Sequence, residues 1–215
     1  GWGPTHSERM PELPDSIFAT LFSRLDRLPG TQKTLIQRAS VVGDTFWESS
    51  LRFPAPALGS DAVALGQLQA QGWVGQHDES AFLGDLEYGF VNHMVRESAY
   101  KGLTRPRRSE EHYRVAQWLE DRVGDRLQEF IELLAYHYGQ GALQALDDDE
   151  DDAGPLVKAI SYGWQAAERA RLHSAFHEAL TRYDDTLRLV DRLELREDPT
   201  LTVGGKAPAQ VALDV

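Results

Sequence analysis

Apolar residues recur at helical spacing along most of this chain, and the pattern breaks in one place, between residues 73 and 91. Helical spacing brings an apolar residue to the same face every three or four positions. In the interrupted stretch, residues 73–77 (WVGQH) and 87–91 (EYGFV) have the composition of short β-strands on either side of a polar, glycine-containing loop. We therefore expect a mainly α fold with one small β-hairpin.

The order of these elements predicts a winged-helix module in the first half of the chain. Three segments of helical spacing precede the hairpin and end at Pro29-Gly30, Gly43 and Gly72, and a fourth over Met94–Leu103 follows it. Three helices followed by a β-hairpin is the winged-helix order. Residues 104–195 then keep helical spacing almost throughout, which predicts antiparallel helical hairpins of tetratricopeptide type.

These patterns divide the chain into six segments. The boundaries fall where helical spacing stops or where an acidic run (DDDEDD) interrupts it. We expect a linker at 1–12, a winged-helix domain at 13–103, a helical hairpin at 104–146, an acidic loop at 147–155, a tetratricopeptide-like helix pair at 156–197 and an irregular tail at 198–215.

The helix pair at 156–197 shows the small residues that a tetratricopeptide repeat needs where its two helices cross. Ala167 and Ala179 are twelve positions apart, with Tyr183 one turn later, whereas Gly163 and Thr186 depart from the repeat pattern. A single pair cannot bury both of its faces, so we expect further repeats in the parent protein.

Composition excludes several classes of site. The 215 residues include no cysteine, which rules out disulfides, thiolate metal sites and cysteine nucleophiles. No stretch approaches the roughly 18 apolar residues of a membrane helix, and residues 1–12 lack the basic start and apolar run of a signal peptide. We expect a cytoplasmic protein without membrane contact.

No motif for nucleotide hydrolysis is seen. A phosphate-binding loop requires G-x-x-x-x-G-K-[ST], and Gly204-Gly205-Lys206 lacks both the leading glycine and the following Ser or Thr. We therefore expect this chain to be no enzyme and to hold no cofactor of its own.

Two patterns suggest metal binding at first sight. His173 and His177 are four apart on a predicted helix, but Ser174 stands where the H-E-x-x-H motif requires Glu. An EF-hand begun at Asp147 would have Asp where Gly is needed and Lys158 where Glu is needed. We expect solvated surface at both places and no metal.

Charge argues against DNA as the partner. The net charge is −12, and neither the candidate recognition helix (61–71) nor the loop at 76–86 contains Lys or Arg. One basic cluster, Arg105, Arg107 and Arg108, precedes a helix and is a candidate contact for phosphate or for an acidic partner. The alternative is a solvated first turn, partly neutralised by the glutamates at 110–111.

Three stretches carry a family resemblance. The first is 13–47, with the motifs PDS (14–16), RLDRLP (24–29) and ASVVG (39–43); the second is FVNHMVRESAY (90–100); the third is WLE (118–120) followed by LAYHY (134–138). They resemble the region that follows the ATPase core in bacterial STAND-type, AAA-like signalling ATPases, which are often fused to nucleotide cyclases, kinases or transcription regulators. The resemblance covers about residues 13–193.

This resemblance implies a regulatory role. In the family, the winged helix packs on the protein's own nucleotide-binding core and helps to hold it closed with ADP, while the helical repeats receive a partner or signal. The chain would then be a non-catalytic fragment of a protein that binds ATP and ADP, and Gly1-Trp2 would end the ATPase lid. The alternatives are a DNA-binding winged-helix transcriptional regulator and an adaptor without a nucleotide switch.

The resemblance also singles out His93. In related switch ATPases, including plant immune receptors, a Met-His-Asp motif ends the winged helix, and its histidine reaches the β-phosphate of ADP. Residues 92–94 of this chain read Asn-His-Met, so the histidine matches and its neighbours do not. The resemblance implies that His93 contacts ADP in the parent protein; the alternative is a histidine satisfied by backbone at the end of a strand.

Overall fold

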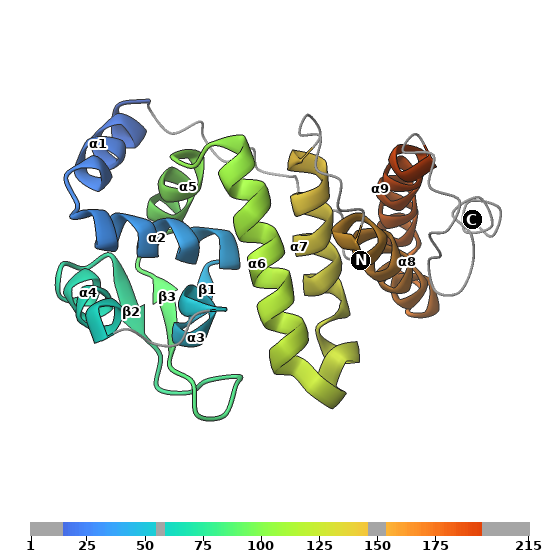
Figure 1. Cartoon of the computed structure of the whole chain (residues 1–215), viewed down its shortest axis with the longest axis horizontal. Coiled ribbons are helices and arrows are strands. Elements are labelled where there is room, and N and C mark those ends of the chain that lie inside the picture. Colours follow the sequence, from blue (N-terminus) through green and yellow to red (C-terminus); the bar gives the residue numbers. More distant parts are fainter. Residues whose placement is uncertain (1–14, 55–58, 146–153, 195–215) are drawn as a thin grey trace, which may run out of the picture.

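The computed structural model describes residues 15–54, 59–145 and 154–194, and within them the fold is mainly α with one small sheet (Figure 1). The expected linker at 1–12, the DDDEDD run, the tail at 198–215 and Gly204–Lys206 lie outside the described residues. The first half comprises α1 (Asp15–Asp26), α2 (Gly30–Val42), β1 (Thr45–Trp47), α3 (Glu48–Arg52), α4 (Gly59–Ala70), β2 (Val74–Gln76), β3 (Glu87–Phe90) and α5 (His93–Lys101).

Helix α2 lies at the centre of this half because its apolar face is buried on several sides. Leu35, Ile36 and Ala39 are almost fully buried, and α4, α5 and α6 all pack against the helix. The helix ends at Gly43, as its sequence predicts, with φ at 156°. A Cβ at this position would lie 3.2 Å from the Thr45 carbonyl, so glycine suits the turn into β1.

The sheet has three antiparallel strands in the order β1-β3-β2. The predicted hairpin of β2 and β3 is confirmed, with Val74 opposite Phe90 and Gln76 opposite Tyr88. Strand β1 and the short helix α3 were not predicted. Because β1 has only three residues, its alternation is too brief to read, and it becomes a strand by pairing with β3.

The second half is a row of helices that extends away from the sheet (Figure 1). It comprises α6 (Arg105–Val123), the 3₁₀ helix η1 (Gly124–Glu129), α7 (Ile131–Gln144), α8 (Gly154–Leu172) and α9 (Phe176–Glu194). Each long helix packs mainly against the next along the chain. The prediction of successive helices through this half is confirmed.

The buried core runs through both halves without a break. One cluster of buried apolar residues extends from α1 and α2 through the sheet to α6, α7 and α8, and a smaller cluster centred on Ala167 and Tyr183 lies between α8 and α9. The position at 103–104 is therefore a change of architecture within a continuous core. The division into separate domains stays a prediction.

The crossing of α8 and α9 uses the small residues that the sequence indicated. Ala167 and Ala179 are both buried there. The two residues that depart from the repeat pattern face each other, because a Cβ at Gly163 would lie 2.5 Å from Thr186 Oγ1. The glycine thus leaves room for the threonine, and the two departures compensate one another.

Candidate functional site

His93 is the first residue of α5 and its side chain is more than half exposed. Its ring does not rest on neighbouring backbone, because Nδ1 lies 3.1 Å from Oδ1 of Asp44 in the turn after α2. The preceding Asn92 caps the helix, its side chain accepting from the Met94 N–H at 2.8 Å. Helix α5 thus begins one residue before Met94, where the helical spacing of the sequence starts.

Arg96 lies one turn further along α5 and completes a polar corner with His93 and Asp44. Its Nε donates to the Ser40 carbonyl at 3.1 Å, and its guanidinium is 3.8 Å from the Asp44 carboxylate. If neutral His93 donates Nδ1–H to Asp44, its Nε2 is an acceptor. The ring must therefore take up a proton before Nε2 can donate to a phosphate oxygen.

The three arginines of the basic cluster are engaged within the molecule. Arg107 forms ion pairs with Glu110 and Glu111, both at 2.7 Å. Arg108 donates to the carbonyls of residues 100 and 101, and Arg105 donates to the Leu143 carbonyl at 3.2 Å. They fasten the start of α6 to α5 and α7, which weakens the case for a partner site here.

A buried pair of histidines lies where the two halves meet, and sequence reasoning missed it. His112 of α6 and His137 of α7 are both fully buried, with their Nδ1 atoms 3.0 Å apart. Tyr136 packs edge-on against both rings, at centroid distances of 5.7 and 5.1 Å. A single proton must be shared between the two Nδ1 atoms, because two neutral acceptors would repel.

The neighbouring side chains fix where that proton lies. Gln144 Nε2 donates to the Tyr100 hydroxyl at 3.0 Å, which directs the hydroxyl proton to His112 Nε2, also at 3.0 Å. His112 therefore carries its proton on Nδ1 and donates it to His137. His137 then holds a proton on Nε2, an atom without a well-formed hydrogen bond among the described residues.

Both rings are held neutral. Burial lowers the pKa of His112 to about 3, assisted by the positive charges of Arg96 and Arg108. Burial also lowers the pKa of His137 well below its ordinary value, and the proximity of His112 adds to this, while the Val42 backbone acts in the opposite direction. The pair is thus sealed from solvent and unsuited to acid–base catalysis on a substrate.

An ion cluster joins the same two halves nearby. Glu111 is buried in α6 and pairs with Arg38 of α2 at 3.2 Å and with Arg114 of its own helix. The two arginines also donate to the carbonyls of Leu51 and Ser50 in α3. The cluster locks α6 onto α2 and α3 because each charged group has several partners.

The loop between β2 and β3 folds back onto the helical row. Phe82 is buried, and its ring centroid lies 5.0 Å from that of Trp47, 5.4 Å from Trp118 and 5.2 Å from Phe130. These partners come from β1, α6 and the start of α7. The tip of the hairpin loop therefore joins the two halves at the end opposite the histidine pair.

Backbone contacts hold this loop in place. Arg122 donates to the Leu83 carbonyl at 3.1 Å, and Arg126 donates to the Ala81 carbonyl at 3.2 Å. Asp85 accepts from the Ser49 backbone N–H at 3.2 Å at the start of α3. Arg122, Arg126 and Asp85 thus hold the loop against the rest of the fold.

Helix α4 presents an uncharged face. Its exposed positions are alanine, valine, glycine and glutamine. Val63 is 62% exposed, and a Cβ added at Gly66 would have nothing within 4 Å. A helix that contacts phosphates around a DNA groove carries Lys or Arg on that face. The described face of α4 presents apolar and uncharged polar side chains instead.

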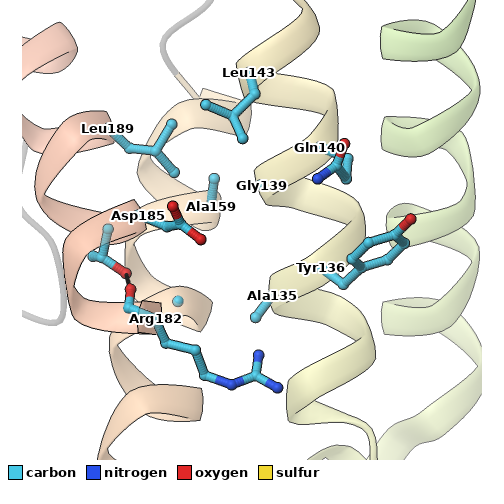
Figure 2. A pocket seen from close by; sticks show the side chains of 11 residues that line it. Ala135, Tyr136, Gly139, Gln140, Leu143, Ala159, Arg182, Asp185 and Leu189 are labelled. Carbon is cyan, nitrogen blue, oxygen red and sulfur yellow. Dashed lines mark hydrogen bonds between the residues drawn. The ribbon is translucent and has the colours of Figure 1, made fainter. Parts of the chain in front are cut away.

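A cavity of about 130 Å³ opens between α7, α8 and α9 (Figure 2). Arg182 and Asp185 of α9 extend toward its opening, whereas Tyr136 points toward α6. Arg182 is already 2.7 Å from Glu178, so its charge is largely balanced. The floor is made of small and aliphatic residues, namely Ala135, Gly139, Leu143, Ala159, Gly163 and Leu189.

Glu120 ties three helices of the row together. Its carboxylate on α6 accepts from Tyr138 of α7 at 2.7 Å and from Tyr162 and Lys158 of α8 at 2.7 and 2.6 Å. Burial alone would raise the pKa of Glu120, but these hydrogen bonds outweigh it and lower the pKa. The pKa values of Tyr138 and Tyr162 are raised by burial and by the same carboxylate.

The prediction that His173 and His177 lie on one helix is wrong. His173 lies in the turn after α8, where Ser174 adopts φ 61°, and His177 is in the first turn of α9. Among the residues that the structure describes, no group of three His, Cys, Asp or Glu side chains is placed to hold a metal ion. None of the described helices is long and apolar enough to span a membrane.

Comparisons of this chain with protein-family models, with curated proteins and with solved structures find no match.

Proposed function

We propose that this chain is the non-catalytic regulatory and interaction region of a STAND-type signalling ATPase. Its first half would be the winged helix that packs on the nucleotide-binding core, and its helical row would be tetratricopeptide-like hairpins that receive a partner or signal. The family assignment rests on the three sequence motifs at 13–47, 90–100 and 118–138. In this proposal the parent protein binds ADP and ATP, and the chain itself does no chemistry.

The observation that carries the proposal is the folded-back hairpin loop. Phe82 is buried among Trp47, Trp118 and Phe130. A wing that reads DNA extends from the fold, whereas this one fastens the sheet to the helical row. A region that transmits a signal from its helices to a nucleotide core benefits from such a rigid connection.

A second observation supports a path between the two ends. The end of α2 and the turn after it border both His93 and the buried histidine pair. Asp44 contacts His93, and the Val42 backbone acts to raise the pKa of His137. Arg96 lies between them, donating to the Ser40 carbonyl. In this proposal a shift of α7 changes the position of His93, the residue proposed to contact ADP.

The alternative, a DNA-binding transcriptional regulator, retains support only from element order. The uncharged face of α4 and the packing of Phe82 of the wing against the helical row both oppose it.

Deletion in the parent protein tests the proposal. The parent lacking residues 15–194 should bind ATP but release ADP faster than the intact protein, because the region that holds the core closed is gone. ATP binding serves as the control for a folded core. Equal ADP retention by the truncated and intact proteins would refute the regulatory role.

A further inference from the structure

Helix α9 is the last described helix of the row, and no described helix or strand packs on one of its sides (Figure 1). Helix α7 lies between α6 and α8, whereas α9 packs on α8 and touches α7, with no other described element in extensive contact. In the row, α8 covers the side of α7 that faces away from α6. No described helix covers the equivalent side of α9. A helix is the shape of partner that this position accepts.

The open side carries an apolar stripe. Phe176 and Leu180 are 63% and 66% exposed, and Leu187 is half-buried on the same face, at spacings of four and seven residues. The pair at 156–197 cannot bury both of its faces on its own, so an apolar patch on its outer side is expected. It is present beside Leu187 and extends toward the start of α9, while the side chain of Leu193 lies outside the described residues.

Two carboxylates flank this stripe. Asp184 lies four residues after Leu180, and Asp191 lies four residues after Leu187, so both are on the same side of the stripe. Both are exposed, and neither makes an ion pair or hydrogen bond with any residue that the structure describes. Asp185, by contrast, pairs with Arg188 at 3.2 Å.

The other flank of the stripe is electrically balanced. Trp164 of α8 packs against Tyr183 at a centroid distance of 5.3 Å, and Glu168 is paired with Arg171 at 2.7 Å. The uncompensated charge beside the stripe is therefore negative and is confined to one side. A bound helix gains most if it brings an apolar face and positive charges along one edge.

We propose that the outer edge of α9, formed by Phe176, Leu180 and Leu187 with Asp184 and Asp191, does not receive a further repeat of the parent protein. It docks instead an amphipathic helix of a partner protein that carries Lys or Arg beside its apolar face. This deepens the proposed function, since it names where the helical row would receive its partner. It does not depend on the nucleotide core, so the two ideas can fail separately.

A peptide of defined charge tests the proposal on residues 1–215. The probe is a fluorescein-labelled synthetic helix of about 18 residues, five turns long, with leucine along one stripe and lysine along one edge of it. A matched peptide has glutamate in place of each lysine. Fluorescence anisotropy should show that the lysine peptide binds and that the glutamate peptide binds at least about tenfold more weakly, a difference of about 1.4 kcal/mol.

Variants then locate the site. Leu180→Glu should weaken binding of the lysine peptide by about tenfold or more, since it buries a charge in the interface, while Val63→Glu on α4 should not. Asp184→Lys combined with Asp191→Lys should reverse the preference toward the glutamate peptide. Asp78→Lys combined with Glu79→Lys changes the net charge equally in the exposed hairpin loop and should leave the preference unchanged.

Three results would overturn the proposal. The first is an equal effect of the two double charge reversals, which would indicate attraction to net charge alone. The second is unchanged binding by the Leu180→Glu protein. The third is a dimer in sedimentation that Leu180→Glu dissociates and that excludes the peptide, which would make a second copy of the chain the occupant.

Discussion

His112 Nδ1 and His137 Nδ1 face each other at 3.0 Å in the buried contact between α6 and α7. The distance requires that one ring donates and the other accepts. The surrounding hydrogen bonds assign the donor to His112. Because Val42 of α2 borders the same pair, this contact joins the helical row to the centre of the first half.

The free energy of unfolding should fall as the pH is lowered from 7.5 to 5.5. The folded protein keeps both histidines neutral because burial lowers their pKa, whereas the unfolded chain takes up protons near pH 6.5. The unfolded state therefore binds more protons, and stability declines by about 1.4 kcal/mol for each histidine. Urea titrations at several pH values measure this slope.

Replacement of His137 separates the contribution of the buried histidines to the pH dependence of stability from that of other titrating groups. His137→Leu should lower stability at pH 7.5, because His112 loses its partner, and should reduce the pH dependence by the contribution of one histidine. The reduction should exceed that in the matched control His173→Leu, which replaces an exposed histidine in the turn after α8. An unaltered slope in the His137 variant would show that the buried ring titrates normally.

Phe82→Ala should destabilise the protein by about 3–5 kcal/mol, the usual cost of removing a buried aromatic ring. Phe82 is 4% exposed, and its neighbour Leu83 is 99% exposed. Leu83→Ala is therefore a control in the same loop and should change stability by less than about 0.5 kcal/mol. Similar unfolding midpoints for the two variants would mean that the loop does not clamp the helical row.

Gly163→Ala should destabilise the contact between α8 and α9 by about 1–3 kcal/mol, because its Cβ would lie 2.5 Å from Thr186 Oγ1. In a Thr186→Ala background the same change should become neutral or stabilising. Gly139→Ala, at an open position in α7, should stabilise by up to about 1 kcal/mol. Thermal unfolding of the wild type, the two single variants at 163 and 186 and the double variant measures the coupling between these positions. Additive effects would contradict the predicted clash.

Sequence periodicity predicted the long helices and the hairpin because each depends on spacing within one segment. The strand β1 needs its partner β3 before it can be recognised, since Thr45–Trp47 is only three residues long. The fit of Gly163 to Thr186 likewise appears only when α8 and α9 are packed, although both positions stood out in the sequence.

The polar sites also depend on contacts between segments that are distant in the sequence. His93 was found through a local motif, but its partner Asp44 lies 49 residues away. His112 and His137 are 25 residues apart and meet only because α6 and α7 are antiparallel. No single-sequence signal distinguishes Phe82, which is buried, from the neighbouring Leu83, which is exposed.

Duplex DNA should bind this chain no better than it binds a generic acidic protein. The exposed face of α4 carries no charge, and the hairpin loop has no Lys or Arg and is fastened to the helical row by Arg122 and Arg126. Fluorescence anisotropy with random and genomic duplexes at physiological salt measures this. Sub-micromolar binding that weakens as salt is raised would restore the transcription-regulator alternative.

The most direct test of the central claim is the rate of ADP release from the full-length parent protein carrying His93→Ala. The exposed ring of His93 beside Asp44 is proposed to donate to the ADP phosphate, and a lost hydrogen bond to a charged group accelerates release by about tenfold or more. His173→Ala is the matched control and should release ADP at the wild-type rate. His93→Ala alone should release ADP faster and show raised basal activity; unchanged ADP release and unchanged basal activity would contradict this role of His93.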